Sequence, residues 1–297
     1  RDRSLVVPRL GASGPRRFDV LGVIRAFVEE APAVAELRAE ATRRHARWYA
    51  ALAHRHLLRP PTPAERARLA SERDNLHAAL HTCLGEVAAP GAAEAEALLD
   101  LVRALEQAQG SAAGLGPLAE RTVRLAGEHH ARGRVEVLRV AARALRHAGD
   151  LAAAEATLRE AEQVAHDDAA ARGAVVVDRG VLHHQRREVE AAEACYRQAL
   201  ALHRAAHDRA GEGRALGNLG ALAHDLGRWD EARALYTEAL EHVARADDVA
   251  LGGRFWANLG VLELEVGRSP EARACFERAN VALEQVGDRR LLAITRG

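Results

Sequence analysis

Two pairs of polar residues in the C-terminal half of the chain share one spacing. Arg214 and Asn218 are four positions apart, and Arg254 and Asn258 repeat that spacing 40 residues later. Residues four apart on a helix lie on one face. An Asn amide offers donors and an acceptor to an extended peptide backbone, and an Arg guanidinium binds a carboxylate through two hydrogen bonds. The pairs predict a surface that binds a peptide or protein; alternatively, the Asn residues bond neighbouring helices and the Arg side chains are solvated.

Three more residues belong to this candidate surface by position. Asp178 lies 40 residues before Asn218 and takes its place in the preceding copy of the pattern. His184 and His224 are related by the same interval and follow further along the same faces. We include all three among the predicted partner-binding residues.

The remaining residues that could carry chemistry do not converge in the sequence. His77 and His81 are four apart on an expected helix with Cys83 nearby, a spacing that metals use. No second cluster of ligands is evident, so we expect partly exposed helix histidines there. No Ser/His/Asp or Cys/His arrangement stands out, and the carboxylates are scattered. We therefore expect no catalytic residue, no metal and no cofactor in this segment.

The charge balance and the absence of lysine exclude several functions. Lys+Arg and Asp+Glu both count 42 in 297 residues, so no overall field favours nucleic acid or anionic lipid. Without Lys there is neither a P-loop nor Schiff-base chemistry. No apolar run approaches the length of a membrane span, and the three cysteines form no CxxC pair. These features predict a cytoplasmic protein, and the absence of Met favours a segment of a longer one.

A repeat along the chain positions the candidate residues. Four segments align without gaps, and their starts are 38, 40 and 40 residues apart. Each has an Ala, a large apolar residue four positions later and another Ala three positions after that, which places all three on one helix face. The segments are GDLAAAEATLREAE from Gly149, REVEAAEACYRQAL from Arg187, GRWDEARALYTEAL from Gly227 and GRSPEARACFERAN from Gly267. The small residues predict a close helix neighbour, and the large residue fills the gap between the helices.

A second helical pattern precedes these segments. ALGNLGALAHDLG and FWANLGVLELEVG align, with Gly220 and Gly260 in the same place. Glycine in a helix costs up to about 1 kcal/mol relative to Ala, so its recurrence predicts tight helix packing. Cys195 and Cys275 also occupy equivalent positions, two copies apart, and we expect small buried spacers there rather than a disulfide.

The residues before the repeats are also expected to be helical. AELRAEATRRHARWYAALAHRH fits one long amphipathic helix. Thr62 to Glu65 form a capping box that starts a helix running to about Cys83. After two Gly/Pro/Ala breaks, helices near 93–109 and 117–129 fit a degenerate first repeat.

The first residues of the chain contain two short strand patterns. SLVVP is β-branched, RRFDVL alternates polar and apolar residues, and Gly11, Gly14 and Pro15 between them predict a hairpin with a loose turn. A helix is expected from about Leu21. Because the glycines lie in a turn rather than between a strand and a helix N-terminus, GASGPRR does not predict a phosphate site.

The repeats resemble tetratricopeptide repeats. NLG in the first helix of a pair and A-x3-[YF]-x2-A in the second carry the resemblance, over about residues 133–286. The period is longer than the usual value of about 34. The resemblance implies a right-handed helical solenoid whose concave groove is lined mainly by the first helices. In peptide-binding members an Asn at the matching position often clamps the ligand backbone, a role that the resemblance extends to Asn218 and Asn258.

Two other stretches resemble parts of bacterial signal-transduction ATPases of the STAND class and of AfsR- and LuxR-type regulators. One stretch is similar to the end of their winged helix, and the other to a helix that precedes their repeats. The matching residues are Arg17-Phe18, Val20-Leu21, Arg25 and Phe27 in the first stretch, and Glu72, Asp74, Asn75, Leu76 and Ala78-Ala79-Leu80 in the second. The resemblance implies that an ATPase core lies upstream of this chain and that Arg16 and Arg17 face it.

We therefore predict an all-α tetratricopeptide-repeat solenoid in 131–297, a helical linker with a degenerate repeat in 34–130 and a winged-helix remnant with a β-hairpin in 1–33. The resemblance implies a regulatory module that binds a peptide or protein in the groove and releases autoinhibition of the upstream ATPase. A constitutive interaction scaffold and a transcription factor whose DNA-binding domain lies outside this segment stay as alternatives. We expect no direct contact with nucleic acid or membrane.

Overall fold

The fold is described from a computed structural model. It describes residues 6–9, 17–20, 35–58, 62–86, 90–109, 112–127, 129–286 and 289–296. The helices are α2 (Ala35–Leu57), α3 (Pro63–Ser71), α4 (Arg73–Glu86), α5 (Ala92–Gln109), α6 (Gly116–Ala126), α7 (Ala131–Ala148), α8 (Leu151–Val164), α9 (Ala169–Gln185), α10 (Val189–Ala205), α11 (Arg209–Asp225), α12 (Trp229–Arg245), α13 (Val249–Glu265), α14 (Ser269–Val286) and α15 (Arg289–Arg296).

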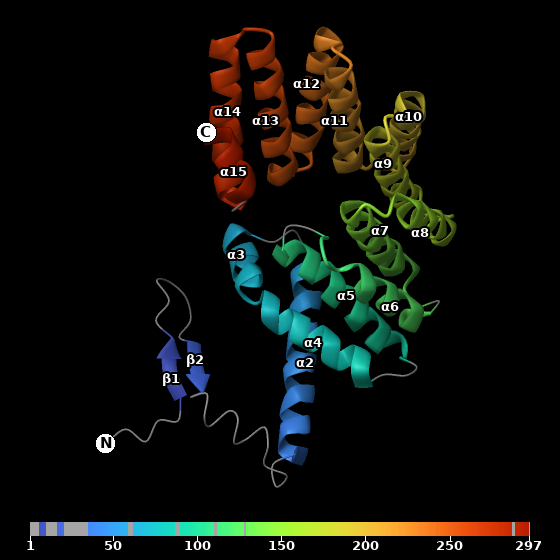
Figure 1. Ribbon diagram of the computed structural model, residues 1–297, viewed down its shortest axis with the longest axis vertical. Helices are drawn as coiled ribbons and strands as arrows, with labels where there is room; N and C mark the ends of the chain where they lie inside the picture. Colours follow the sequence, from blue (N-terminus) through green and yellow to red (C-terminus); the bar gives the residue numbers. More distant parts are fainter. Residues whose placement is uncertain are drawn as a thin grey trace.

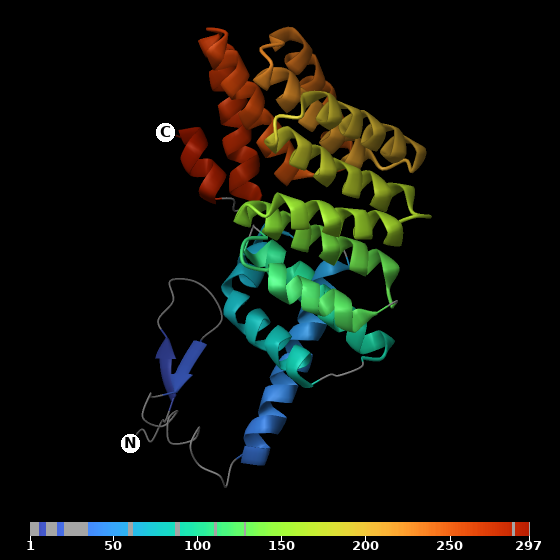
Figure 2. The same cartoon turned by 45° about the vertical axis from the view of Figure 1, so that its right-hand side comes forward.

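Helices α7 to α14 form a solenoid of four antiparallel pairs. The partners within the pairs are α7 and α8, α9 and α10, α11 and α12, and α13 and α14, and each pair packs on the next one (Figures 1 and 2). The first helices of successive pairs also contact one another. The stack curves, so that α14 returns to contact α3 from the N-terminal half (Figure 1). The predicted helical solenoid is therefore confirmed.

A contact between a glycine and an aromatic ring recurs within the last three pairs. A Cβ atom on Gly220 of α11 would lie 2.9 Å from the Tyr236 ring of α12, and one on Gly260 would lie 2.8 Å from the Phe276 ring. Gly180 faces Tyr196 in the same way. The predicted close packing at the NLG glycines is thus confirmed, since these positions have no room for any side chain.

On the second helix of each pair, small residues and one large residue share the face that packs against the first helix. Tyr196 and Tyr236 are almost completely buried, and alanines flank each ring on the same helix face. The buried alanines are Ala154, Ala161, Ala192, Ala199, Ala232, Ala239, Ala272 and Ala279. Cys195 and Cys275 are buried free thiols beside the rings, as predicted.

The turns between helices also have the same conformation in each repeat. Gly149, Gly227 and Gly267 follow the first helices with φ of 87°, 71° and 79°, a left-handed conformation that glycine adopts without strain. Arg187 takes the same place in the second pair with φ of 62°. On the other side of the stack, Asp168, Asp208 and Asp248 cap α9, α11 and α13 by accepting a backbone N–H.

The N-terminal helices differ from the prediction at one point. The capping box is present, since Thr62 Oγ1 accepts the Glu65 N–H at 3.3 Å and the Thr62 N–H donates to Glu65 at 2.8 Å. The helix does not run on to Cys83, however, because α3 ends at Ser71 and α4 begins at Arg73. Glu72 at the break accepts hydrogen bonds from the Tyr49 hydroxyl and the Asn75 amide, both at 2.7 Å. The bond from Tyr49 links the break to α2, and the bond from Asn75 comes from the first turn of α4.

The first residues form a hairpin, but a winged helix is not supported. β1 (Val6–Arg9) pairs antiparallel with β2 (Arg17–Val20), with Val6 opposite Val20 and Arg9 opposite Arg17. A two-stranded hairpin does not by itself define a winged helix. The helix expected from Leu21, with Arg25 and Phe27, lies outside the described residues.

Replacing Gly220 with Ala tests the glycine–ring contact. We expect Gly220→Ala to lower the free energy of unfolding by about 1–3 kcal/mol, because the new methyl group overpacks the Tyr236 ring. Gly252→Ala is the matched control in α13, where the new Cβ would meet Val243 at an ordinary 3.8 Å. This control should be neutral or stabilising by up to about 1 kcal/mol, since Ala favours helix. Equal effects of the two substitutions in urea titrations would contradict the packing argument.

Candidate ligand-binding groove

The inner face of the solenoid encloses a groove of about 1970 Å³. The first helices α7, α9, α11 and α13 line its length, α3 and the end of α5 close one side, and α14 and α15 close the other. Residues from the two closing sides include Arg66 and Ala70 of α3 and Leu291 and Ile294 of α15. The groove is therefore bounded by elements that lie more than 200 residues apart in the sequence.

Both predicted Arg–Asn pairs line this groove. Arg214 and Asn218 face it from α11, and Arg254 and Asn258 face it from α13. Arg214 and Asn218 are partly buried, whereas Arg254 and Asn258 are exposed. Asn258 also hydrogen-bonds the Tyr236 hydroxyl, a bond that partly offsets the rise in the pKa of Tyr236 that burial causes.

Three of these four side chains have unused hydrogen-bonding capacity. Arg214, Asn218 and Arg254 make no hydrogen bond or ion pair with any residue in the described ranges. Burial lowers the pKa of Arg214, and the nearby guanidinium of Arg139 adds to this effect. Asp248 and Asp178 attract this charge without forming an ion pair with it, and no acceptor among the described residues hydrogen-bonds the guanidinium. An anionic or carbonyl group of a ligand would supply such an acceptor.

Asp178 lines the groove but is already paired. Its carboxylate accepts hydrogen bonds from Arg139 Nε at 2.7 Å and from Arg143 Nη1 at 3.2 Å. Burial opposes ionisation of Asp178, yet these two guanidinium groups hold its pKa below the usual range. Asp178 thus differs from Asn218, its equivalent one repeat later, in having its bonding capacity used within the protein.

The partners of Asp178 belong to a larger network at the α7 end of the groove. Arg139 also pairs with Glu136 at 3.0 Å, and Arg143 pairs with Glu106 of α5 through three hydrogen bonds of 2.6, 2.7 and 2.8 Å. Arg139 is buried, so it depends on these carboxylates for its charge balance. Neither Arg139 nor Arg143 was among the predicted site residues, and their spacing, four apart on one helix face, is the feature of the sequence that could have indicated the network.

His184 and His224 are not among the residues that line the groove. His184 Nε2 lies 2.9 Å from Asp225 Oδ2 in the next pair, and His224 Nε2 lies 3.0 Å from Glu265 Oε2 in the pair after that. Each histidine therefore links the end of one first helix to the end of the next. Their equivalent positions reflect the stacking of repeats.

The histidine pair His77 and His81 does not gather further ligands in the described part of the chain. The two rings stack with centroids 6.5 Å apart, and His77 Nε2 lies 2.9 Å from the Gln109 amide. Burial, with a smaller effect of His81, lowers the pKa of His77. A different group, His54, Glu96 and Asp100, does come together between α2 and α5.

This second group was not predicted, because 46 residues separate His54 from Asp100 in the sequence. His54 Nδ1 lies 2.8 Å from Asp100 Oδ2, and Glu96 is 3.9 Å from the same nitrogen. Arg103 already balances Asp100 at 3.0 Å. The contacts are those of a hydrogen-bonded ion network that joins the two helices.

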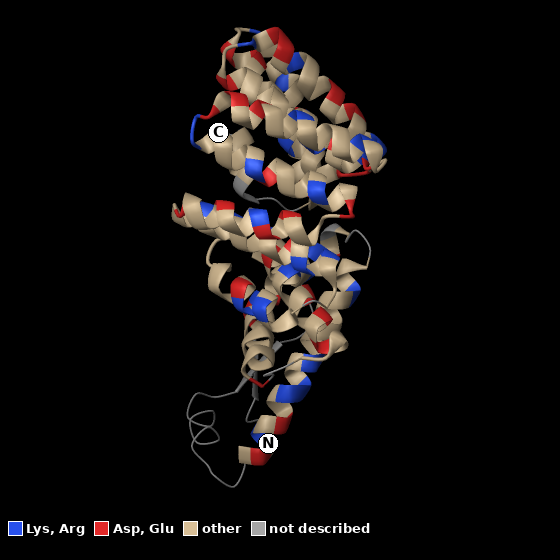
Figure 3. Ribbon diagram, turned by 90° about the vertical axis from the view of Figure 1, so that its right-hand side faces the viewer, with Lys and Arg blue, Asp and Glu red and all other residues tan. Residues whose placement is uncertain are grey.

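Charges of both signs are interspersed over the helices (Figure 3). In this view neither sign dominates, in agreement with the formal net charge of zero. Among the described residues, no helix is long and apolar enough to cross a membrane.

A protein-family comparison fits this geometry. The family model for the tetratricopeptide repeat matches residues 172–245, which include most of α9 and all of α10 to α12. These residues are tetratricopeptide repeats. The match includes Asp178, Arg214 and Asn218, and the α13–α14 pair repeats the same contacts beyond it. A search of curated proteins finds no match to the chain.

Solved structures share the fold. A STAND signal-transduction ATPase with a tetratricopeptide-repeat sensor from Pyrococcus horikoshii is 16% identical, with a TM-score of 0.55; the alignment covers 94% of this chain and 45% of that one. The apo form of RapI is 11% identical over 73% of this chain and 95% of its own, with a TM-score of 0.50. A Rap protein in complex with the competence and sporulation factor is 15% identical over 78% and 71%, with a TM-score of 0.50. These identities show a common fold alone.

Replacing Asp178 tests the network at the α7 end. We expect Asp178→Asn to lower the free energy of unfolding by about 3 kcal/mol, because Arg139 loses a buried counter-charge. The pKa of Asp178 is lower in the folded protein than in the unfolded chain, where it is about 3.9. Its ionised carboxylate therefore stabilises the fold above about pH 3.9, and this contribution is lost as the pH falls through the pKa of the folded state. The difference from wild type should therefore hold at neutral pH and shrink in acid.

Asp230→Asn is the matched control for this measurement. Asp230 pairs with Arg233, but its side chain is 94% exposed, so the substitution should change stability little. Urea titrations across the acid range measure both variants. A loss in Asp178→Asn that stays constant down to the lowest pH would contradict the ion-pair explanation.

Proposed function

We propose that the chain is an interaction module that binds an extended peptide, or an extended segment of a protein, in the groove. The unused bonding capacity of Arg214 and Asn218 is the observation that carries this proposal. The recurrence of the pair as Arg254 and Asn258 one repeat later supports a ligand that runs along the groove. Helical repeat folds of this kind serve mainly as binding surfaces.

In this proposal the two Asn side chains bind the backbone of the ligand, and the two Arg side chains bind its acidic groups. The amides of Asn218 and Asn258 donate to and accept from the ligand backbone at two points one repeat apart. Arg214 and Arg254 bind acidic side chains or a terminal carboxylate. Asp178 keeps Arg139 and Arg143 occupied, so it shapes the end of the groove rather than contacting the ligand.

A peptide selection tests this proposal. Peptides selected from a random phage-displayed library on the wild-type protein are synthesised, and their affinities are measured by fluorescence anisotropy. We expect the double variant Asn218→Ala/Asn258→Ala to bind them at least about tenfold more weakly, because two hydrogen-bonding amides are lost. His224→Ala, outside the groove, is the control and should bind as wild type does. Equal affinities for the double variant and wild type would overturn the clamp.

At the level of the intact protein, the proposal is a sensor that regulates a STAND-type ATPase. The motif resemblance at residues 72–80 and the common fold with a STAND ATPase that carries a repeat sensor support it. The complex of a Rap protein with the competence and sporulation factor supports a role in binding a partner. In this proposal, occupation of the groove releases autoinhibition of an upstream ATPase core.

Deletion of residues 131–297 from the intact protein tests the regulatory role. Nucleotide turnover and oligomeric state should both change, because an inhibitory contact is removed. Turnover assays and size-exclusion chromatography with light scattering measure these properties. If neither property changes on deletion, although selected peptides bind the groove of the undeleted protein, the chain is a constitutive scaffold.

A further inference from the structure

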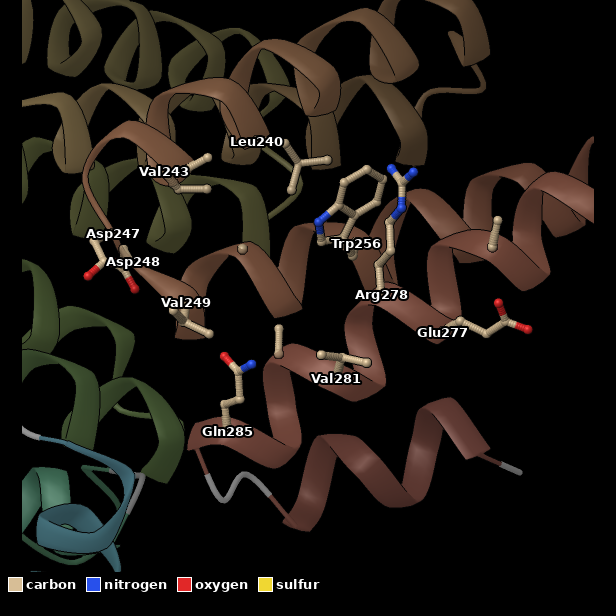
Figure 4. Close-up of a pocket in the computed structure, with 14 residues that line it drawn as sticks. Leu240, Val243, Asp247, Asp248, Val249, Trp256, Glu277, Arg278, Val281 and Gln285 are labelled. Carbon is tan, nitrogen blue, oxygen red and sulfur yellow. The ribbon is translucent and has the colours of Figure 1, made fainter.

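A second, smaller pocket lies between the second helices of the last two repeats. It has a volume of about 590 Å³, within the range of small-molecule sites. Leu240 and Val243 of α12 cover one side, Val249 and Trp256 of α13 form the floor, and Val281 of α14 covers the other side (Figure 4). Val281 is 58% exposed, although most of its neighbours in the pocket are apolar.

The preceding repeat shows why this pocket is open. Between α10 and α12, the equivalent groove is crossed by ion pairs: Arg204 lies 3.8 Å from Glu212 and 3.5 Å from Glu238, and His242 lies 3.5 Å from Glu212. Forty residues later, the same four positions are Ala244, Gly252, Arg278 and Ala282. The repeat frame is kept, but three of the four groups that bridge the groove are reduced to small residues.

At the fourth position an acidic residue is replaced by a basic one that forms no ion pair with a described residue. Arg278 stands where the preceding repeat has Glu238, and it makes no hydrogen bond or ion pair with any described residue. Its guanidinium lies 4.6 Å from the centre of the Trp256 ring instead. The indole N–H of Trp256 is likewise without a hydrogen-bond acceptor among the described residues. Two hydrogen-bond donors beside the Trp256 ring are thus left for a ligand.

The acidic groups of the pocket do not neutralise these donors. The Glu277 side chain points away from the Trp256 ring, and Asp247 and Asp248 lie at the opposite end (Figure 4). Asp248 already accepts the Leu251 N–H at 3.0 Å as a helix cap. The pocket is therefore polarised along α13, with donors beside Trp256, an apolar middle and carboxylates beyond Val249.

We infer that this pocket is a binding site for a small amphipathic acid, a molecule with an apolar ring or chain and one anionic head. The apolar body lies against Leu240, Val243 and Val281, and the head accepts a charge-assisted hydrogen bond from Arg278 beside the Trp256 ring. This site is separate from the Arg–Asn pairs, and the inference does not depend on peptide binding in the groove.

Anilinonaphthalene sulfonate, with an aromatic body and an anionic head, is the probe for the test. In a Trp48→Phe/Trp229→Phe background, Trp256 is the single tryptophan, and its emission reports the probe by energy transfer. We expect one site per chain. Arg278→Gln should weaken sulfonate binding by about tenfold or more, because a charge-assisted bond is lost. The neutral analogue phenylnaphthylamine should lose little affinity in that variant.

A second variant fills the pocket with the side chains of the preceding repeat. Ala244→Arg/Gly252→Glu restores the pair that Arg204 and Glu212 make one repeat earlier, so the helices should still fold, as circular dichroism can check. Binding of both probes should be lost in this variant and kept in the Arg204→Ala control. Unchanged binding in the filled variant would overturn the site, and an equal loss of both probes in Arg278→Gln would overturn the anionic class of ligand.

Discussion

The contact between a first-helix glycine and a second-helix aromatic ring sets the geometry on which the other features depend. Gly180, Gly220 and Gly260 leave room for Tyr196, Tyr236 and Phe276, and the small residues around each ring let the paired helices approach. A side chain on any of these glycines would separate the pair. Since each pair packs on the next, one separated pair would also displace the first helices that line the groove.

This packing turns one side of each first helix to its partner and leaves another side to the groove. Asn218 is two residues before Gly220, and Asn258 stands in the same relation to Gly260. The polarity of the groove then changes along the stack. At α7 and α9 the charges of Arg139, Arg143 and Asp178 satisfy one another, whereas Arg214 and Arg254 form no ion pair with a described residue, although Asp248 and Asp178 attract the charge of Arg214. The charged side chains at the α7 end of the groove are therefore bonded to one another, whereas those from α11 and α13 can still form hydrogen bonds with a ligand.

The features that recur in every repeat could be predicted from the sequence, whereas contacts with a single residue of another helix could not. The period, the buried Ala columns and the NLG contacts followed from spacing, because every copy obeys the same packing. The partners of Asp178 and His184 come from other helices, and nothing in their own segments indicates which acid or base will face them. The break at Glu72 depends on Tyr49 of α2 in the same way. The winged helix was inferred from a motif whose helical part lies outside the described residues.

The surface of one repeat differs from that of the next at the positions where the residue type changes between repeats. Replacing a bridging Arg, Glu and His by Ala244, Gly252 and Ala282 changes no backbone contact that defines the pair, yet it opens a pocket beside Trp256. Asp247, Asp248 and Val249 line both this pocket and the groove. The turn from α12 to α13 is thus a common wall, and a ligand on either side of it contacts the segment from which Arg254 and Asn258 are held in the groove.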